Sequence, residues 1–508
     1  MNLLSTTSIF SFFTLFSRIL GYLRDILIAF FLGTSIFADA FFVAFRLPNT
    51  FRRLFAEGTF NAAFIPSYTS ARIESKKKGK KFADDILGSL LLILIFIVTI
   101  IEIFTPYLVY LIAPGFIEND IKFTLAVELT RITFPFLLFV SLSSFFSGIL
   151  NSNNKFAAAA AAPIILNIIL ILSLVISYKL NLNFVRQLSY GVTFAGILQL
   201  LFLFLVTLKF YKPSLVFKIK KDSKVKFFFK KLIPSIFSSG VTQINILIGT
   251  IIASFETGAV SYLYYADRVY QINLAIAGIA VSTVSLPVLS KAFKNNNIKK
   301  LSNIQNKSFE LSLLLSMPAS LGLILASEEI VNALFGYGSF SKDDVELTAS
   351  ALKYFGYGVP AFALVKILSN FFFARNNTKT PFYISTSMVI INILISVSLF
   401  SSVGFIIIPI ATSTSTWIGV LIYIYLLNQK KSLLLNTDLI SNFLKILVST
   451  AIMSVILILT LNNYESVLDY SYKLKAIYLL AIVGFMGIVY LLSCNILGIL
   501  KIKNYKTN

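Results

Sequence analysis

The sequence predicts an all-α polytopic membrane protein with about fourteen transmembrane helices, arranged as two six-helix lobes and two further C-terminal helices. Its composition carries the first part of this prediction. Of the 508 residues, 57% are hydrophobic and only 13% are charged, whereas about a quarter of the residues in soluble proteins are charged. Nearly uncharged apolar runs, such as 90–103, 163–177 and 390–399, recur along the whole chain. The apolar surface is therefore too extensive for one buried core and must face lipid.

The apolar segments have the length of membrane spans, because about 20 helical residues cross a hydrocarbon core of ~30 Å. They lie at 7–31, 36–68, 84–112, 124–150, 157–178, 188–210, 228–254, 260–290, 308–333, 346–373, 381–400, 404–427, 441–461 and 474–500. Pro48 is expected to break or kink the long second segment, because proline lacks a backbone donor. The start of the chain lacks a basic region and a small-residue cleavage site before Arg18, so it reads as a retained first helix.

Lysine and arginine indicate the orientation of these helices. The chain carries 44 basic and 22 acidic residues, a net charge of +22. Most of the excess lies in short connections such as 74–81, 209–231 and 291–307, which alternate with connections poor in Lys and Arg, such as 114–122 and 338–346. The positive-inside rule places the basic connections and both termini in the cytoplasm. This distribution indicates membrane topology and not a nucleic-acid partner.

Several kinds of chemistry lack their usual residues. The single cysteine, Cys494, excludes an internal disulfide, and the absence of histidine excludes an imidazole ligand or base. No phosphate-binding G-x-x-x-x-G-K-[ST] motif occurs, so the chain is not expected to hydrolyse ATP. No cofactor is expected.

An internal repeat defines the expected domains. Residues 134–136, 151–153 and 167–169 resemble 359–361, 376–378 and 392–394 after a shift of about 225 residues, and 29–33 resembles 253–257. A repeat of six helices preserves orientation, so the two lobes are expected to be parallel and to face each other across a central cavity. The predicted domains are an N-lobe at 1–212, a C-lobe at 213–430, and helices 13 and 14 with a cytoplasmic tail at 431–508.

Ionisable residues inside apolar segments are the candidate functional residues, because each costs on the order of 3 kcal/mol in the bilayer core. Arg18 lies roughly 16 Å into the first helix, near the midplane. A net-cationic cavity selects an anion, and the arginine fork matches phosphate oxygens. The candidate substrate-binding residues are Arg18, Arg24, Asp25, Arg52 and Arg268. The candidate cavity-lining or gating residues are Asp39, Arg46, Arg53, Glu57, Asp267 and Lys366.

Structural roles compete with this interpretation. The charges could form ion pairs, such as Arg24 with Asp39, or anchor helix ends at the membrane interface. Asp25 and Asp267 each adjoin an arginine and are interpreted as partners that tune its charge more than as ligands.

Several motifs resemble one family. Residues 17–25 (SRILGYLRD), 39–49 (DAFFVAFRLPN) and 52–58 (RRLFAEG), with 63–66 (AFIP), resemble the start of the MurJ (MviN) lipid II flippases. Later pieces at 113–116 (APGF), 264–268 (YYADR), 286–290 (LPVLS) and 379–381 (KTP) extend the resemblance over nearly the whole chain, and it is weakest after about residue 430.

The resemblance implies the fold of the multidrug/oligosaccharidyl-lipid/polysaccharide exporter superfamily and transport of lipid II, the polyprenyl-pyrophosphate-linked muropeptide, across the bacterial inner membrane. It implies that Arg18, Arg24 and Arg268 lie in a cationic central cavity and that the polyprenyl tail lies in a groove involving the last two helices. It also implies that membrane potential or an ion gradient supplies the energy. Lipid II and membrane lipids are the expected partners, and cell-wall synthesis proteins are candidate partners.

Other functions remain open at this point. A flippase for another polyprenyl-linked oligosaccharide, such as an O-antigen precursor, would need the same cationic cavity, so only the family motifs favour lipid II. A cation-coupled drug exporter would call for acidic cavity walls instead. A membrane enzyme of cell-wall synthesis would need catalytic carboxylates near a loop. The only acidic loop clusters, Glu118 with Asp120 and Asp343 with Asp344, are interpreted as solvated turns.

Overall fold

The computed structural model describes residues 3–54, 60–214 and 243–500, together with positions 228, 230 and 240. Every regular element in these ranges is a helix. Ten of the helical stretches are long and apolar enough to cross a membrane. The prediction of an all-α polytopic membrane protein is thus confirmed, while the count of about fourteen helices and the lobe layout stay predictions. The chain divides into two compact units, Met1–Ser261 and Tyr262–Asn508. The predicted repeat-based domain boundaries stay predictions as well.

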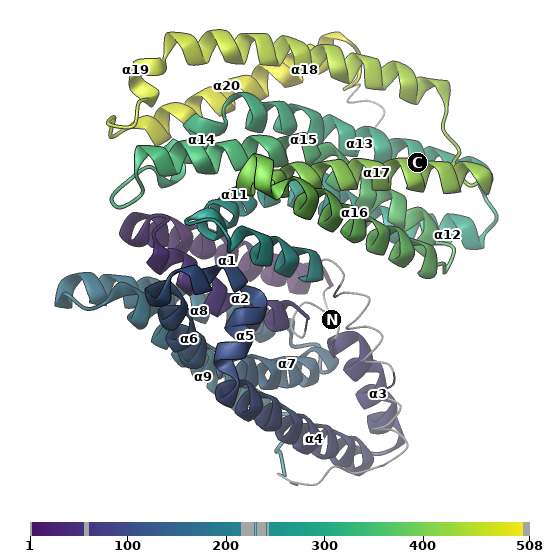
Figure 1. Ribbon diagram of the computed structural model, residues 1–508. Helices are drawn as coiled ribbons and strands as arrows, with labels where there is room; N and C mark the ends of the chain where they lie inside the picture. Colours follow the sequence, from purple (N-terminus) through teal and green to yellow (C-terminus); the bar gives the residue numbers. More distant parts are fainter. Residues whose placement is uncertain are drawn as a thin grey trace. The chain divides into compact units, whose positions relative to one another are not determined.

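The first unit contains one long N-terminal helix and a series of helices of varied length (Figure 1). Its elements are α1 (Leu3–Leu32), α2 (Ile36–Leu54), α3 (Phe60–Glu74), α4 (Lys76–Ile103), α5 (Thr105–Ile112), the 3-10 turn η2 (Pro114–Glu118), α6 (Asp120–Thr133), α7 (Phe136–Ser152), α8 (Phe156–Leu180), α9 (Phe184–Thr207) and a helical stretch at Gln243–Ala253. Helix α8 packs against both α1 and α9.

The second unit begins within α11 and ends in a long antiparallel pair, α18 and α20, which lie side by side in Figure 1. Its elements are α11 (Ala259–Leu274), the π-helical stretch η3 (Ala275–Ala280), α12 (Val281–Lys294), α13 (Ile298–Leu325), α14 (Ser327–Phe335), α15 (Lys342–Phe373), α16 (Lys379–Val403), the 3-10 turn η4 (Gly404–Ile406), α17 (Ile407–Gln429), α18 (Thr437–Asn463), α19 (Glu465–Leu468) and α20 (Lys475–Ile496).

Local sequence explains where many of these helices begin. Asn119 caps α6 by accepting the backbone N–H of Lys122 at 3.0 Å. Ser341 and Asp344 form a reciprocal capping box at the start of α15. Such side chains satisfy backbone donors that have no partner within the first helical turn. The polar residues between apolar segments therefore set the helix starts.

Pro48 lies inside α2, which continues beyond it to Leu54, so this proline does not break the helix, and the expected kink stays a prediction. Proline lacks the N–H that would bond to the carbonyl of Ala44, four residues earlier. That carbonyl instead accepts the hydroxyl of Thr133, on α6, at 2.9 Å. A neighbouring helix thus replaces the hydrogen bond that proline removes.

Four predicted segments each contain two helices. Segments 36–68, 84–112, 124–150 and 308–333 correspond to the pairs α2–α3, α4–α5, α6–α7 and α13–α14. Two of the breaks coincide with proline: Pro135 directly precedes α7, and Pro106 lies in the first turn of α5. Hydropathy alone does not detect such breaks, because the apolar character continues across them. Segment 228–254 lies partly outside the described residues.

Apolar side chains occupy both the core and the outer surface of each unit. Phe60, Phe64 and Phe145 are fully buried in the aromatic-rich core of the first unit. On α20, by contrast, Leu480 and Ile488 are exposed, although Met486 on the same helix is buried. Large apolar side chains on an outer helix face are stable in contact with lipid and costly in water. The second unit is therefore built to be surrounded by membrane.

Candidate functional site

Arg24 and Asp25, adjacent on α1, form a buried ion pair. Arg24 Nη2 and Nε lie 2.6 and 3.0 Å from Asp25 Oδ1. Arg24 Nη1 donates to Oδ1 of Asn167, on α8, at 3.0 Å. Arg24 is only 5% exposed. The guanidinium is therefore held from two sides, by a carboxylate on its own helix and by an amide on a neighbouring helix.

This pairing bears on two of the sequence predictions. The interpretation of Asp25 as a partner that tunes the charge of its arginine agrees with the ion pair. The alternative pairing of Arg24 with Asp39 is not the one that forms, because the carboxylate of Asp39 pairs with Lys122. The pairing of adjacent residues was visible in the sequence, whereas the contact with Asn167 was not.

The other arginines of the first two helices occupy different environments. Arg18 is exposed on α1, one and a half turns before Arg24. On α2, Arg46, Arg52 and Arg53 are half-buried, and Nε of Arg52 donates to Asn49 Oδ1 at 3.0 Å. Glu57, the acidic candidate that follows these arginines, lies outside the described residues. Arg24 is thus the only one of the described candidate arginines that is fully buried.

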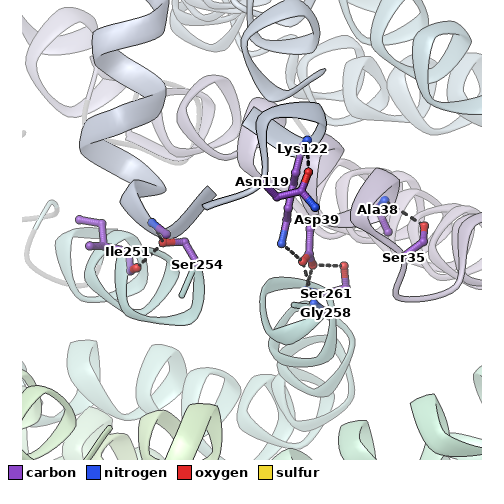
Figure 2. A network of polar contacts seen from close by, with 10 residues as sticks. Ser35, Ala38, Asp39, Asn119, Lys122, Ile251, Ser254, Gly258 and Ser261 are labelled. Atoms are coloured by element: carbon purple, nitrogen blue, oxygen red, sulfur yellow. Dashed lines mark hydrogen bonds and ion pairs between the residues drawn. The ribbon is translucent and has the colours of Figure 1, made fainter. Parts of the chain in front are cut away.

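Asp39, on α2, is the centre of a second buried cluster, shown in Figure 2. Its side chain is 0% exposed. Its Oδ2 accepts Lys122 Nζ at 2.7 Å and the N–H of Gly258 at 2.8 Å. Its Oδ1 accepts the N–H and the hydroxyl of Ser261 at 3.0 and 2.6 Å. Nζ of Lys122 also lies 4.1 Å from the centre of the Phe116 ring.

Asp39 provides the N-cap of α11 from another helix. Gly258, directly before α11, has a φ of 80°, a conformation that glycine adopts without strain. Glycine has no side chain that could accept the first N–H groups of the helix. The Asp39 carboxylate accepts one of them, the N–H of Ser261, and also the N–H of Gly258 just before the helix. Its negative charge is also stabilised at the positive end of the helix dipole.

The loop around Gly115 packs closely against the segment that precedes α11. The N–H of Gly115 donates to the hydroxyl of Ser254 at 3.0 Å. A Cβ at position 115 would lie 2.5 Å from backbone atoms of Ser254 and Phe255. Only glycine fits this contact, so the loop that leads into α6, the helix of Lys122, has a fixed position on this segment.

The candidate residues of the second unit lie on α11 and α15. Asp267 and Arg268 are half-buried, Gln271 Nε2 donates to Asp267 Oδ2, and the Arg268 guanidinium lies 5.4 Å from the centre of the Tyr264 ring. Lys366 is exposed on α15. The structure therefore brings the described candidates together in small groups within each unit.

Sequence reasoning missed Lys122, Asn167 and Ser261. Lys122 was assigned to the connection at 114–122, in which Glu118 and Asp120 were interpreted as a solvated turn. Those two acids are indeed exposed, as is Asp343, whereas Asp344 is half-buried and belongs to the capping box. Glu118 ends the 3-10 turn η2, and the other three acids lie in the first turns of α6 and α15. Three of the four are exposed as expected, but the interpretation of these clusters as loop turns is wrong for the three acids at helix starts. Gly258, which has no side chain to cap the helix it precedes, was the one available signal for the contact between Ser261 and Asp39.

Comparisons with known proteins agree with this picture over most of the chain. The family model described as lipid II flippase MurJ matches residues 28–479. The probable lipid II flippase MurJ of Rickettsia prowazekii (strain Madrid E) is 39% identical over 503 residues, covering 97% of this chain and 98% of that protein. The corresponding protein of Rhizobium tropici is 38% identical over 462 residues, covering 90% of this chain and 86% of that one.

Solved structures show the same relationship. A structure described as lipid II flippase MurJ, inward closed conformation, superposes with a TM-score of 0.82 at 30% identity, covering 96% of this chain and 98% of that one. An inward-facing multidrug resistance MATE family transporter of the MOP superfamily superposes with a TM-score of 0.68 at 15% identity, covering 82% and 95% of the two chains. The second likeness is one of fold alone.

Proposed function

Because the chain belongs to the MurJ family of lipid II flippases, we propose that it moves lipid II from the cytoplasmic to the periplasmic leaflet of the bacterial inner membrane by alternating access. Lipid II joins an undecaprenyl tail to a muropeptide through a pyrophosphate. The tail is soluble in the bilayer, but the charged headgroup cannot cross hydrocarbon without a polar path. The protein provides that path and transfers the headgroup without breaking a covalent bond.

Buried Arg24 is the observation that most directly supports an anionic substrate. The guanidinium lies within α1 among apolar residues, held by Asp25 and Asn167. Keeping a cation there costs free energy that packing alone would not require. A pyrophosphate offers oxygen acceptors that match the arginine fork better than water does. Arg18, Arg52 and Arg268 are the further cations proposed to contact the headgroup.

Asp39 is proposed as a gating residue. Its carboxylate caps α11, the helix that carries Asp267 and Arg268 farther along. Four hydrogen bonds hold this carboxylate, and all of them can be exchanged for bonds to water when the contact opens. An alternating-access cycle requires contacts that are stable in one state and replaceable in the other.

Membrane potential is the proposed energy source, because the headgroup is an anion that moves outward. An inside-negative potential favours that direction by about 2.3 kcal/mol per charge for each 100 mV. The two charges of a pyrophosphate therefore correspond to roughly 5 kcal/mol at 100 mV. The proposal places both termini in the cytoplasm, with fourteen helices in two lobes, in agreement with the alternation of basic connections.

The test is a rescue experiment in a bacterium depleted of its own flippase. The chain is expressed there, and an enzyme that cleaves lipid II only from outside reports its arrival at the periplasmic face. Wild type should yield cleavage product, and Arg268→Ala and Arg24→Ala should yield little. Arg186→Ala removes an arginine whose side chain is half exposed on α9 and should retain activity.

Expression and melting temperature of each variant separate loss of transport from loss of folding. Well-folded Arg24→Ala and Arg268→Ala variants that flip normally would refute the proposed cationic path. If the expressed wild type gives no product while it transports another polyprenyl-linked sugar, the substrate is that oligosaccharide lipid and not lipid II.

A further inference from the structure

Asn167 occupies a central position in the contact between α1 and α8. It is 6% exposed. Its Oδ1 accepts Nη1 of Arg24 at 3.0 Å, and its Nδ2 donates to the backbone carbonyl of Ser17 at 2.8 Å. The amide lies directly over Gly21, where an added Cβ would be 3.6 to 3.9 Å from its atoms. Asn167 thus bridges about two turns of α1, from the carbonyl of Ser17 to the side chain of Arg24.

The two contacts together fix the orientation of the amide. Rotating it by 180° would place Nδ2 against the donors of Arg24 and Oδ1 against the carbonyl of Ser17. Both contacts would then be repulsive. A leucine of similar volume would provide neither contact. The amide is therefore anchored to the backbone of α1 and presents one acceptor in a fixed place.

This acceptor acts on the end of the guanidinium that Asp25 does not hold. Asp25 engages Nε and Nη2, along one edge, and Asn167 engages Nη1. One partner alone would leave the planar group free to swing about its bonds to that partner. Two partners on different edges set both its plane and its direction.

The second unit offers an internal comparison. Asn392, on α16, occupies the position that the predicted repeat relates to Asn167. Its Nδ2 donates to the Thr412 hydroxyl at 3.3 Å, and its Oδ1 accepts the hydroxyl of Ser396 at 3.1 Å. At the offset that relates 29–33 to 253–257, the position of Arg24 corresponds to Ile248. The amide of Asn392 thus bonds to hydroxyl groups in the second unit, whereas the amide at the related position in the first unit, Asn167, bonds to an arginine.

We propose that Asn167 is a positioning residue, which orients the Arg24 guanidinium to receive the pyrophosphate of the substrate. This inference depends on the proposed function, because it assigns to Asn167 a part in binding the same headgroup. Asn167 acts through Arg24 and need not touch the substrate itself. Losing a hydrogen bond to a charged group is expected to weaken binding roughly tenfold or more.

A double-mutant cycle on the purified full-length chain tests this inference. The variants are Asn167→Leu, Arg24→Lys and the combination, with Asn392→Leu as the matched control. Binding of lipid II and of undecaprenyl pyrophosphate is measured for each, together with the melting temperature. Asn167→Leu should weaken binding about tenfold when Arg24 is present and less than about twofold in the Arg24→Lys background, since residues in one network do not act additively. Asn392→Leu should bind as wild type does.

A purely structural role for Asn167 would give a different pattern. Asn167→Leu would then weaken binding equally in both backgrounds, or lower the melting temperature without changing binding, and either result would overturn the inference. If wild type binds undecaprenyl pyrophosphate but not lipid II, the proposed substrate is wrong, and the cycle measured with the pyrophosphate still decides the role of Asn167. Failure to bind either lipid would refute both.

Discussion

The two units of the chain bury cations in different ways. In the first unit, each of the two buried cations described above has a carboxylate partner: Arg24 pairs with Asp25, and Lys122 pairs with Asp39. In the second unit, Lys475, at the start of α20, is 0% exposed. All three of its hydrogen bonds go to neutral oxygens, each at 2.7 Å.

The neutral cage around Lys475 comes from one small region. The acceptors are Oδ1 of Asn332 and the carbonyls of Gly336 and Tyr470, and the rings of Tyr337 and Tyr470 lie 4.3 and 4.6 Å from Nζ. Burial raises the pKa of the Tyr337 hydroxyl, so this ring remains a neutral phenol that attracts the ammonium by its face. The three donors of the ammonium are all used.

The difference indicates different roles. Asn332 lies on α14, Gly336 follows its last residue, and Tyr470 lies in the connection before α20. The Lys475 cage therefore fastens that connection to the end of α14. The Asp39 carboxylate accepts from separate segments, and its bonds can be exchanged for others without loss of a helix. A cation paired with a carboxylate, as at Asp39, thus suits a contact that opens and closes. A cation held by neutral oxygens, as at Lys475, suits a contact that stays closed.

The largest effect is expected from removing the carboxylate of the Asp39 cluster. Asp39→Ala leaves Lys122 buried without its partner and the start of α11 uncapped, which should lower the free energy of unfolding by about 3–5 kcal/mol. Adding Lys122→Met should recover part of this loss, because the unpaired charge is then gone. Unfolding of the purified protein in detergent, followed by tryptophan fluorescence or circular dichroism, measures both changes.

Asp120→Ala, at an exposed acid on α6, is the matched control for Asp39. If Asp39→Ala is no more destabilising than Asp120→Ala, the cluster does not carry the stability assigned to it. A double variant that is less stable than Asp39→Ala alone would show that Lys122 contributes independently of the ion pair.

A smaller effect is expected at Lys475. Lys475→Met keeps the apolar stem and leaves three acceptors without a donor, which should destabilise the protein by about 2–3 kcal/mol after partial hydration of the acceptors. Transport by the molecules that remain folded should change little, in contrast to Asp39→Ala. Lys473→Met, two residues earlier and exposed, is the control. A Lys475→Met variant that is fully stable but transports poorly would reverse the roles assigned to the two kinds of site.

The sequence predicted the fold well, because hydropathy reports on each helix separately. Helix starts, basic connections and the pairing of Arg24 with Asp25 all depend on residues that are close in sequence. Charges inside apolar segments pointed to Arg24 and Asp39 as candidate functional residues, but their partners Asn167 and Lys122 lie 143 and 83 residues away. In the sequence, Asn167 is a lone amide in an apolar helix and resembles an ordinary packing residue. Lys122 follows two acids and resembles a residue of an ordinary loop. Only the fold shows that the amide meets the buried guanidinium of Arg24 and that the lysine meets the buried carboxylate of Asp39.

The breaks within apolar segments were equally hard to predict. Proline accounts for the break at Pro135, yet Pro48 leaves α2 continuous, because Thr133 supplies the missing donor to Ala44. The consequence of a proline therefore depends on a neighbouring helix that the local sequence does not identify.

The smallest effect is expected at an ion pair with good geometry but no burial. Arg186 Nε lies 2.7 Å from Glu128 Oε1, the same separation as in the Lys122–Asp39 pair, yet both side chains are exposed, at 52% and 39%. Water and salt screen such a pair, so Arg186→Ala or Glu128→Ala should move the melting temperature by no more than about 1 °C. Raising the salt concentration should remove even this shift and leave the large effect of Asp39→Ala nearly unchanged. If removing the exposed pair lowered the melting temperature as much as Asp39→Ala does, the separation of the charges and not their burial would set the strength of both pairs. The three kinds of charge contact distinguished here would then have no physical basis in this protein.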